Sequence, residues 1–302
     1  MIWSVLTIEP KRDDVGDEII RRVVAPLTSQ RAAEDGRLAF TRNLDSGHPS
    51  VVLYLNATDS GVGRLAKLAQ ALADENVDKL GEVNISRSPN IVFPVAPGDP
   101  IALATEVFLA RFGGPKGVEL LQENTRVSSD LTLWAINRFP TLKTRSMLAA
   151  LLLFDTAHAM MRGPRSALWP DRRAISWDYY WNTHLHTCTG SLGSSPESVR
   201  TAMAQIAPRV MPTHRVMAAV ASEPAVDIWR KRWVRAIDEY LYRADKNRIS
   251  RSAPQLAMVA GHLTLNRLGF PSRDQGALGL YARAWSKEIE AKYLGEERSR
   301  TR

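Results

Sequence analysis

Cysteine is nearly absent from the sequence: Cys188 is the single one among 302 residues. No intramolecular disulfide can form, which fits a protein of a reducing cytosol. The first residues, MIWSVLTIEPKRDD, have no basic region and reach Glu9 too early for a secretory signal peptide. The longest apolar run, 147–154, is far shorter than the roughly 20 residues that cross a bilayer. These absences predict a soluble, cytoplasmic protein with no membrane partner.

Metal and nucleophile motifs are missing as well. The sequence has no His-Glu-x-x-His, Cys-x-x-Cys, Gly-x-Ser-x-Gly or phosphate-binding loop. His184 and Cys188 are four residues apart, so a helix would bring them together as a thiol–imidazole pair. A small buried cysteine beside a histidine is the alternative. Zinc would need two more ligands, which no spaced group supplies. The sequence therefore predicts no metal and no organic cofactor.

The charge of the chain is basic. Forty Lys and Arg against 32 Asp and Glu give a net charge of +8, which attracts an acidic partner. Basic residues alternate with Trp and Tyr in the segment 229–251. Such a segment can stack on nucleic acid, or form a helix with a solvated basic face and its rings inside. Because no nucleic-acid module is recognisable, nucleic acid is not expected as a partner.

Hydrophobic periodicity predicts an α+β fold. The first 98 residues follow the order strand–helix–strand–strand–helix–strand, over 2–9, 13–33, 37–43, 50–58, 63–80 and 81–95. This order is typical of a ferredoxin-like antiparallel sheet layer. From Pro100 onward the pattern is helical, with three helices up to residue 161 and five more beyond. We expect a single domain with an α/β layer over 1–98 and a helical body over 99–302. The alternative is two separable domains divided near Pro97.

The segment 176–190, SWDYYWNTHLHTCTG, is rich in aromatic and titratable side chains. A helix would place five of them on one face: Trp177, Tyr180, Trp181, His184 and Cys188. Tyr179 and His186 would lie to its side. Such a face can line a pocket in which phenol and imidazole groups move protons, or it can pack as ordinary core. The segment alone leaves both readings open.

Four segments along the chain resemble, in order, segments of one known family. RLAFTRNLDSGHPSVVLYLNAT (37–58) is similar to an aromatic-x-Arg segment followed by a His-Leu-Arg-x-Arg strand. TEVFLARFGG (105–114) resembles a Glu…Arg-Tyr-Gly-Gly signature, with Phe in place of Tyr. VSSDLTLWAI (127–136) falls where the family has a short Asp/Ser segment, and HLTLNRLGFP (262–271) is similar to its His…Asn-Arg-Leu-Gly segment. This family is the C-terminal domain of lantibiotic dehydratases.

Two departures from the family pattern bear on function. In full-length dehydratases this domain removes glutamate from glutamylated Ser and Thr with the help of the strand arginines, and Val52 and Tyr54 stand at the matching positions. The chain is also expected to lack the large region that glutamylates with glutamyl-tRNA. The resemblance then implies a stand-alone pyridine synthase of thiopeptide biosynthesis. Such an enzyme joins two dehydroalanines of a linear azole-containing peptide by a formal aza-cycloaddition, and then expels water and the leader peptide.

Two other functions stay open: a non-catalytic protein that binds the precursor peptide, and the glutamate-eliminating half of a split dehydratase. For the synthase, the predicted acid–base or orienting groups are Tyr179, Tyr180, His184 and His186. The predicted substrate-binding residues are Trp177 and Trp181 as walls, Ser128, Ser129 and Asp130 as a polar cluster, and Arg230 and Arg232 as basic groups. The expected partner is a modified precursor peptide with an acidic leader, which an exposed sheet edge could bind as an added strand. A homodimer is left open.

Overall fold

The computed structural model describes residues 2–31, 37–44, 49–89, 103–168, 175–190 and 195–300. Contacts divide the chain into two compact units. The first comprises Met1–Pro140, Lys246–Arg251 and Asn266–Gly269. The second comprises Thr141–Asp245, Ser252–Leu265 and Phe270–Arg302. Because the first unit contains an antiparallel sheet and the second is built from helices, the predicted α+β class is confirmed.

The first unit is built on a four-stranded sheet in the order β2-β3-β1-β4. Its strands are β1 (Ile2–Pro10), β2 (Arg37–Asn43), β3 (Ser50–Ala57) and β4 (Val83–Pro89). Every neighbouring pair is antiparallel. With a helical segment after β1 and another after β3, this is the ferredoxin-like arrangement that the sequence predicted. The part of the last predicted strand beyond Pro89 lies outside the described residues.

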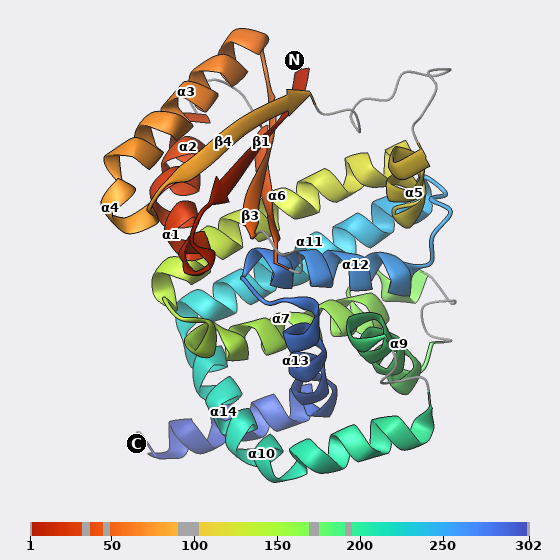
Figure 1. The fold of residues 1–302 in the computed structure, drawn as a ribbon. Coiled ribbons are helices and arrows are strands. Elements are labelled where there is room, and N and C mark those ends of the chain that lie inside the picture. The colour runs from red at the N-terminus through yellow and green to blue at the C-terminus, as the bar shows by residue number, and fades with distance from the viewer. Residues whose placement is uncertain are drawn as a thin grey trace. The chain divides into compact units, whose positions relative to one another are not determined.

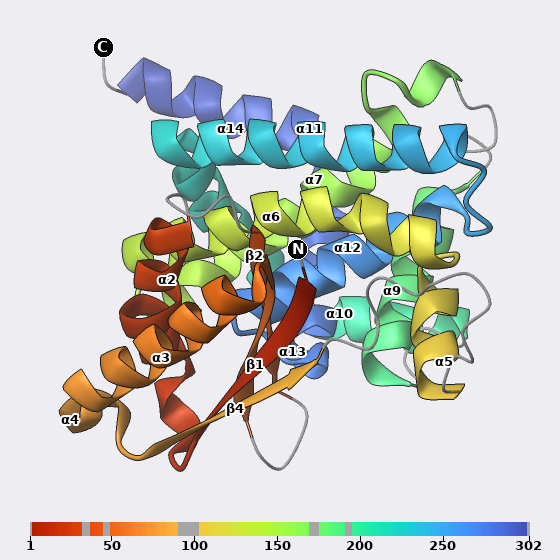
Figure 2. The same cartoon turned by 90° about the horizontal axis from the view of Figure 1, so that it is seen from above.

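Helices pack on one face of this sheet. They are η1 (Asp13–Val15), α1 (Gly16–Ile19), η2 (Ile20–Val24), α2 (Ala25–Arg31), α3 (Asp59–Glu75) and α4 (Val77–Leu80). In the views of Figures 1 and 2, α2 and α3 lie side by side. Alternate strand residues such as Leu6, Ile8 and Leu53 are fully buried against these helices. The period of two in the sequence therefore sets which strand face forms the core.

The first predicted helix is interrupted by a π-helical turn, η2. The turn comes directly before Ala25 and Pro26, and a proline ring clashes with the carbonyl four residues back and lacks its own N–H. A wider turn at that point accommodates the ring, as is usual where one residue is inserted into a helix. The apolar residues of the turn remain in the core.

Two further helices complete the first unit: α5 (Leu103–Arg111) and α6 (Pro115–Arg138). Helix α6 contacts β2 and η2. Its Ile136 joins the hydrophobic core of the sheet layer, and the Ile136 carbonyl accepts a hydrogen bond of 2.9 Å from the Arg21 guanidinium. The ferredoxin-like layer thus shares its core with a helix that begins beyond residue 98.

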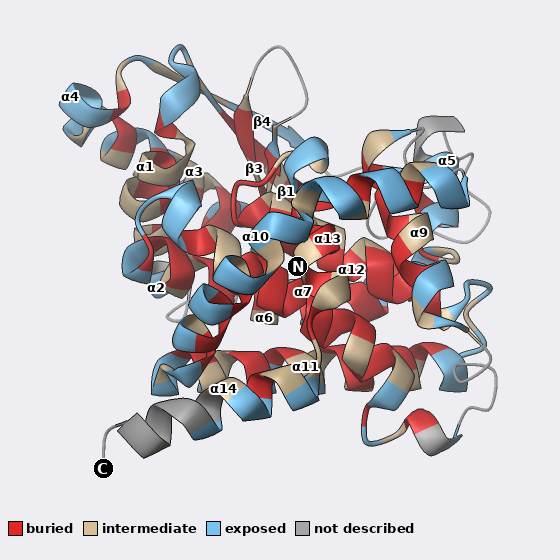
Figure 3. Ribbon diagram, turned by 90° about the horizontal axis from the view of Figure 1, so that it is seen from below, coloured by how far each residue is buried: buried red, intermediate tan, exposed pale blue. Residues whose placement is uncertain are grey.

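The second unit consists of helices around α7 (Leu142–Arg162). The others are η3 (Ser166–Leu168), α9 (Trp177–Thr189), α10 (Pro196–Ser222), α11 (Pro224–Lys246), α12 (Ala253–Arg267), α13 (Ser272–Ala284) and α14 (Lys287–Arg300). Helix α7 is apolar on nearly every side and is largely buried, as Figure 3 shows in red. Six α-helices follow α7 in the described chain, one more than predicted. None of the described helices is long and apolar enough to span a membrane.

Candidate functional site

Helix α9 carries the aromatic segment that the sequence singled out. Its first turn is capped by Ser176, whose hydroxyl accepts a hydrogen bond of 3.0 Å from the backbone N–H of Tyr179. The predicted inner face is confirmed for the buried residues Tyr180, Trp181, His184 and Cys188. Tyr179 is 61% exposed, and His186 is exposed too. The four predicted acid–base groups therefore lie in two environments, two on the surface and two in the core.

A pocket of about 930 Å³ lies at one end of this helix. Its walls include Phe154 and His158 of α7, Trp177 of α9, Arg283 of α13, and Lys287 and Glu288 of α14. Among the predicted site residues only Trp177 lines it. The Trp177 indole is half-buried, contacts the rings of Phe154 and Trp181 edge to face, and donates its N–H to the Arg283 carbonyl at 3.0 Å. Trp177 therefore lies in the wall of a pocket, whereas Trp181, the other predicted wall, is buried and is not among the described lining residues.

His158 is the titratable ring of the pocket, and the sequence analysis did not select it. The ring stacks on Phe154 with centroids 5.5 Å apart. Burial, the charge of Lys287 and the charge of Arg162 lower the pKa of His158, while Asp155 and Glu288 act in the opposite direction. The imidazole is therefore neutral near pH 7 and can accept a proton. Only its position directly after the apolar run of α7 set it apart in the sequence.

Three cations and one carboxylate lie among the described residues that line the pocket: Arg162, Arg283, Lys287 and Glu288. Carboxylates outside this lining pair with Arg283 and with Lys287. The Arg283 guanidinium is oriented by the Asn182 amide oxygen and the Asp178 carboxylate, both at 2.7 Å. Cations of this kind favour ligands that present carbonyl oxygens or carboxylates.

Beneath the pocket lies a buried ion network, which changes the role expected for Arg230. The sequence predicted a surface charge, but Arg230 is only 5% exposed. Its guanidinium donates to both oxygens of Asp155, at 2.7 and 2.9 Å, and to both of Glu290, at 2.7 and 3.1 Å. It is buried because it lies at helical spacing from the buried Trp233 and Ile237 of α11.

Lys287 completes this network from the pocket side, with its ammonium 3.0 Å from Glu290 and 3.8 Å from Asp155. The two positive charges of Arg230 and Lys287 therefore balance the two negative charges of the carboxylates. Burial raises the pKa of Glu290, but the hydrogen bonds and charge of Arg230 outweigh it and lower that pKa to about 2. Arg232, the second predicted basic group, is exposed and lies 4.2 Å from the centre of the Trp229 ring.

The predicted polar cluster lies on α6, in the first unit. Ser128 and Ser129 are buried, and Asp130 is half-buried. The Ser128 hydroxyl accepts a hydrogen bond of 2.9 Å from Arg267, whose Nε donates to the carbonyl of Phe40 at 2.7 Å. Burial lowers the pKa of Arg267 to about 10, so its side chain is still charged near pH 7. Ser128 thus helps to hold Arg267 against β2, within the first unit.

Strand β3, which has Val52 and Tyr54 in place of the family's arginines, has a half-exposed face. Val52 and Tyr54 of β3 both lie on it. Their cross-strand neighbours are Val5, Thr7, Ala39 and Thr41. None of these six side chains carries a positive charge.

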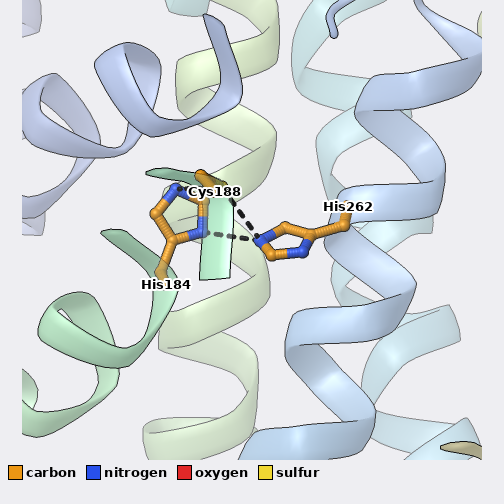
Figure 4. Close-up of side chains that lie close together, drawn as sticks. All are labelled: His184, Cys188 and His262. Carbon is orange, nitrogen blue, oxygen red and sulfur yellow. Dashed lines mark hydrogen bonds between the residues drawn. The ribbon is translucent and has the colours of Figure 1, made fainter. Parts of the chain in front are cut away.

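A second cluster in the second unit joins His184 and Cys188 of α9 to His262 of α12 (Figure 4). His184 Nε2 is 3.0 Å from the carbonyl of Gln275, so the neutral ring donates from that nitrogen. Its bare Nδ1 then accepts from His262 Nε2, at 2.8 Å. The Cys188 sulfur is 3.7 Å from His262 Nε2. The structure thus supplies a third possible metal ligand, from a segment 74 residues away.

Comparison with known proteins gives one family and several similar folds. The family described as "Lantibiotic biosynthesis dehydratase C-term" matches residues 3–285. "Pyridine synthase, TbtD, from thiomuracin biosynthesis" has a TM-score of 0.61 at 14% identity, over 96% of this chain and 99% of that one. TsrL has a TM-score of 0.55 at 16% identity, over 98% of this chain and 95% of that one.

The tRNA dependent lantibiotic dehydratase MibB from Microbispora sp. 107891 is similar as well. Its TM-score is 0.58 at 17% identity, over 97% of this chain but 28% of MibB. No curated protein sequence matches the chain. At these identities the likeness to solved structures is one of fold.

Proposed function

The chain belongs to the family of lantibiotic dehydratase C-terminal domains, as its motifs predicted, and we propose that it is a pyridine synthase of thiopeptide biosynthesis. Its substrate would be a linear peptide that carries azoles, two dehydroalanines and a leader. The fold is similar to that of a protein described as a pyridine synthase, over nearly the whole of both chains.

The composition of the sheet argues against glutamate elimination. Neither Val52, Tyr54 nor any of their four cross-strand neighbours described above is an arginine. A valine and a phenol cannot bind a glutamyl carboxylate as a guanidinium does. The family resemblance assigns that task to arginines of this strand, and Val52 and Tyr54 stand at the matching positions of this chain.

The proposal rests on the pocket that combines an aromatic wall with a neutral imidazole and several cations. In the reaction, one dehydroalanine amide must react as its iminol tautomer. His158 would take the proton from the amide nitrogen, and the same proton would return to the carbonyl oxygen. Lys287 or Arg283 would stabilise that oxygen as charge develops on it. The Trp177 ring would orient the flat azole-bearing segment.

In its iminol form, the first dehydroalanine is an azadiene, with conjugated C=C and C=N bonds. Two carbon–carbon bonds then form between this azadiene and the second dehydroalanine, which closes a six-membered ring bearing a hydroxyl group. Protonation of that hydroxyl allows water to leave. Loss of the leader as its C-terminal amide then makes the ring aromatic, and both eliminations need a general acid and a general base. Holding two distant segments together is an entropic task for a shaped pocket. Tyr179 and His186, exposed on α9, stay candidates for contact with the peptide.

The direct test is incubation of the full chain with a synthetic leader-bearing peptide that contains azoles and two dehydroalanines. We expect mass spectrometry to show loss of water together with release of the leader as an amide. A peptide that binds but is unchanged would instead identify the protein as a non-catalytic holder of the precursor. Elimination of glutamate from a glutamylated peptide would support the split-dehydratase alternative.

Replacement of His158 tests the acid–base role. We expect His158→Gln to lower turnover about 100-fold or more, because general acid–base groups contribute roughly 10²–10⁴-fold. Peptide binding should be unchanged, since the amide keeps the size of the ring and its polarity. Turnover equal to that of the unaltered chain would move the acid–base chemistry away from this pocket.

The role of Lys287 has a matched control in the same chain. Lys287 and Lys116 each pair with a glutamate three residues ahead, but only Lys287 lines the pocket. We expect Lys287→Gln to lower turnover about tenfold or more, whereas Lys116→Gln should leave it unchanged. Equal turnover in both variants would contradict the role of Lys287, provided that circular dichroism shows both to be folded.

A further inference from the structure

The three side chains of Figure 4 have the composition and spacing of a metal site. The ligand atoms of His184, Cys188 and His262 all lie within 4.8 Å of one another. We propose that these residues bind a divalent transition metal of the zinc class. The site is separate from the proposed pyridine synthesis, of which no step passes through it.

Two distances within the cluster are near those of a tetrahedral ion, and all three ligand atoms lie within 4.8 Å of one another. Zinc bonds of about 2.0–2.1 Å to nitrogen and about 2.3 Å to sulfur put tetrahedral ligand atoms about 3.3 Å (N to N) and about 3.6 Å (N to S) apart. The distance from the Cys188 sulfur to His262 Nε2 is 3.7 Å. The two imidazole nitrogens are 2.8 Å apart and would separate by about half an ångström to admit the ion.

The surroundings of His184 orient it as metal-binding histidines are usually oriented. A ligating imidazole commonly donates its second N–H to a backbone carbonyl, which fixes both tautomer and direction. His184 Nε2 lies 3.0 Å from the carbonyl of Gln275 in this way, leaving Nδ1 turned to His262. Gly279 of α13 makes room for the ring, because a Cβ at that position would lie 2.3 Å from His184 Nε2.

The ligand types favour zinc or a similar ion. Thiolate with imidazole suits zinc and copper, whereas magnesium and calcium prefer oxygen ligands. The Nδ1 lone pair of His184 faces His262 Nε2, because the ring donates its N–H from Nε2 to the Gln275 carbonyl. On binding, the Cys188 thiol would release its proton, and the His262 proton would move from Nε2 to Nδ1. Three protein ligands leave a fourth position for water or a small ligand.

The three residues of the cluster differ in exposure. His184 is 1% exposed, but Cys188 is 9% exposed and His262 is half-buried. Of the three, His262 is therefore the most exposed to solvent. A Co²⁺ probe is suitable because cobalt takes the place of zinc and its thiolate complex absorbs light.

The test uses the full chain without a histidine tag, after treatment with a chelator. We expect Co²⁺ to bind one per chain with a thiolate-to-cobalt charge-transfer band, and Zn²⁺ to abolish that band by displacement. Cys188→Ser should remove the band, and His262→Gln should weaken binding at least about tenfold. His186→Gln is the control, because it removes an exposed imidazole of the same helix outside the cluster.

Thermal unfolding gives an independent readout, since an ion that binds only the folded state raises the melting temperature. Zn²⁺ should raise it for the unaltered chain and for His186→Gln but not for Cys188→Ala. Cobalt binding without the charge-transfer band overturns the proposal. So does binding that is equal in the cluster variants and the control. No peptide is present in these measurements, so their outcome is independent of pyridine synthesis.

Discussion

At the scale of residues, Arg230 and Lys231 are neighbours in sequence whose charges lie in different environments. Arg230 is enclosed by Asp155 and Glu290, whereas Lys231 forms an exposed pair with Asp227. Removing Arg230 leaves two buried carboxylates without their main partner. We expect Arg230→Met to lower the free energy of unfolding by about 3–5 kcal/mol. Lys231→Met should change it by about 1 kcal/mol or less. Denaturant unfolding of both variants checks this, and equal losses would contradict the role of the buried network.

Glu290 predicts how this network responds to acid. Its pKa in the folded chain, about 2, lies below the ordinary value of 4.5. The stabilisation is therefore fully present above pH 4.5 and is lost as the pH falls through about 2. We expect the free energy of unfolding to decrease over that range, and to decrease less steeply in Glu290→Gln. Urea unfolding at several pH values measures both slopes, and parallel slopes would show that another group is responsible.

The residues also show what the sequence can and cannot predict about a site. A spacing of four identified His184 and Cys188 as neighbours on one face, because helix geometry fixes that relation. No local rule brings His262 to them, since tertiary packing of α12 against α9 decides it. Likewise, nothing in the sequence distinguishes Arg230 from the other basic residues of the segment 229–251. The sequence does not contain the positions of Asp155 and Glu290 that make its burial favourable.

At the scale of elements, two helical glycines lie in opposite surroundings. A Cβ on Gly279 would lie 2.3 Å from His184, whereas one on Gly63 in α3 would meet nothing within 4 Å. We expect Gly279→Ala to lower the free energy of unfolding by about 1–3 kcal/mol through overpacking. Gly63→Ala should raise it by up to about 1 kcal/mol, because alanine is the better helix former. Thermal unfolding distinguishes the two, and stabilisation by both would mean that α13 shifts to accommodate the methyl group.

Element boundaries were predictable where local chemistry sets them. Ser176 caps α9, and Ser195 caps α10 with Pro196 directly after it, because these side chains satisfy the first free N–H groups of a helix. The number of late helices was underestimated. Helix α10 contains Pro208 and Pro212 yet continues through both. Proline in a helix interior usually ends or kinks the helix, so the sequence does not predict this continuation. Packing against α7, α13 and α14 compensates for the lost hydrogen bonds.

At the scale of the whole molecule, the predicted sheet is confirmed, but its unit is assembled from distant parts of the chain. Segments 246–251 and 266–269 belong with residues 1–140. Asn266 exchanges two hydrogen bonds with the backbone of Arg42, at 2.8 and 2.9 Å, and Arg267 donates to the Phe40 carbonyl. These bonds engage the outer edge of β2. Periodicity predicts strands, yet it contains no information on which remote segment covers an edge.

Because β2 is engaged in this way, the leader peptide of the proposed function is expected to add to β4, the other edge strand. The net charge of +8 should attract an acidic leader as well. The two contributions differ in their response to salt, since the Debye length is about 10 Å at 0.1 M and about 3 Å at 1 M. We expect fluorescence anisotropy of a labelled leader to show weaker binding at 1 M salt, with a remainder that depends on strand pairing.

A leader analogue with alternate N-methylated residues isolates that remainder, because it keeps the charges but cannot donate backbone hydrogen bonds to β4. It should lose the salt-resistant binding and keep the salt-sensitive part. Affinity that does not change with salt would remove the role of net charge. An N-methylated analogue that binds like the natural leader would exclude β4 as the docking edge, because strand addition depends on main-chain hydrogen bonds.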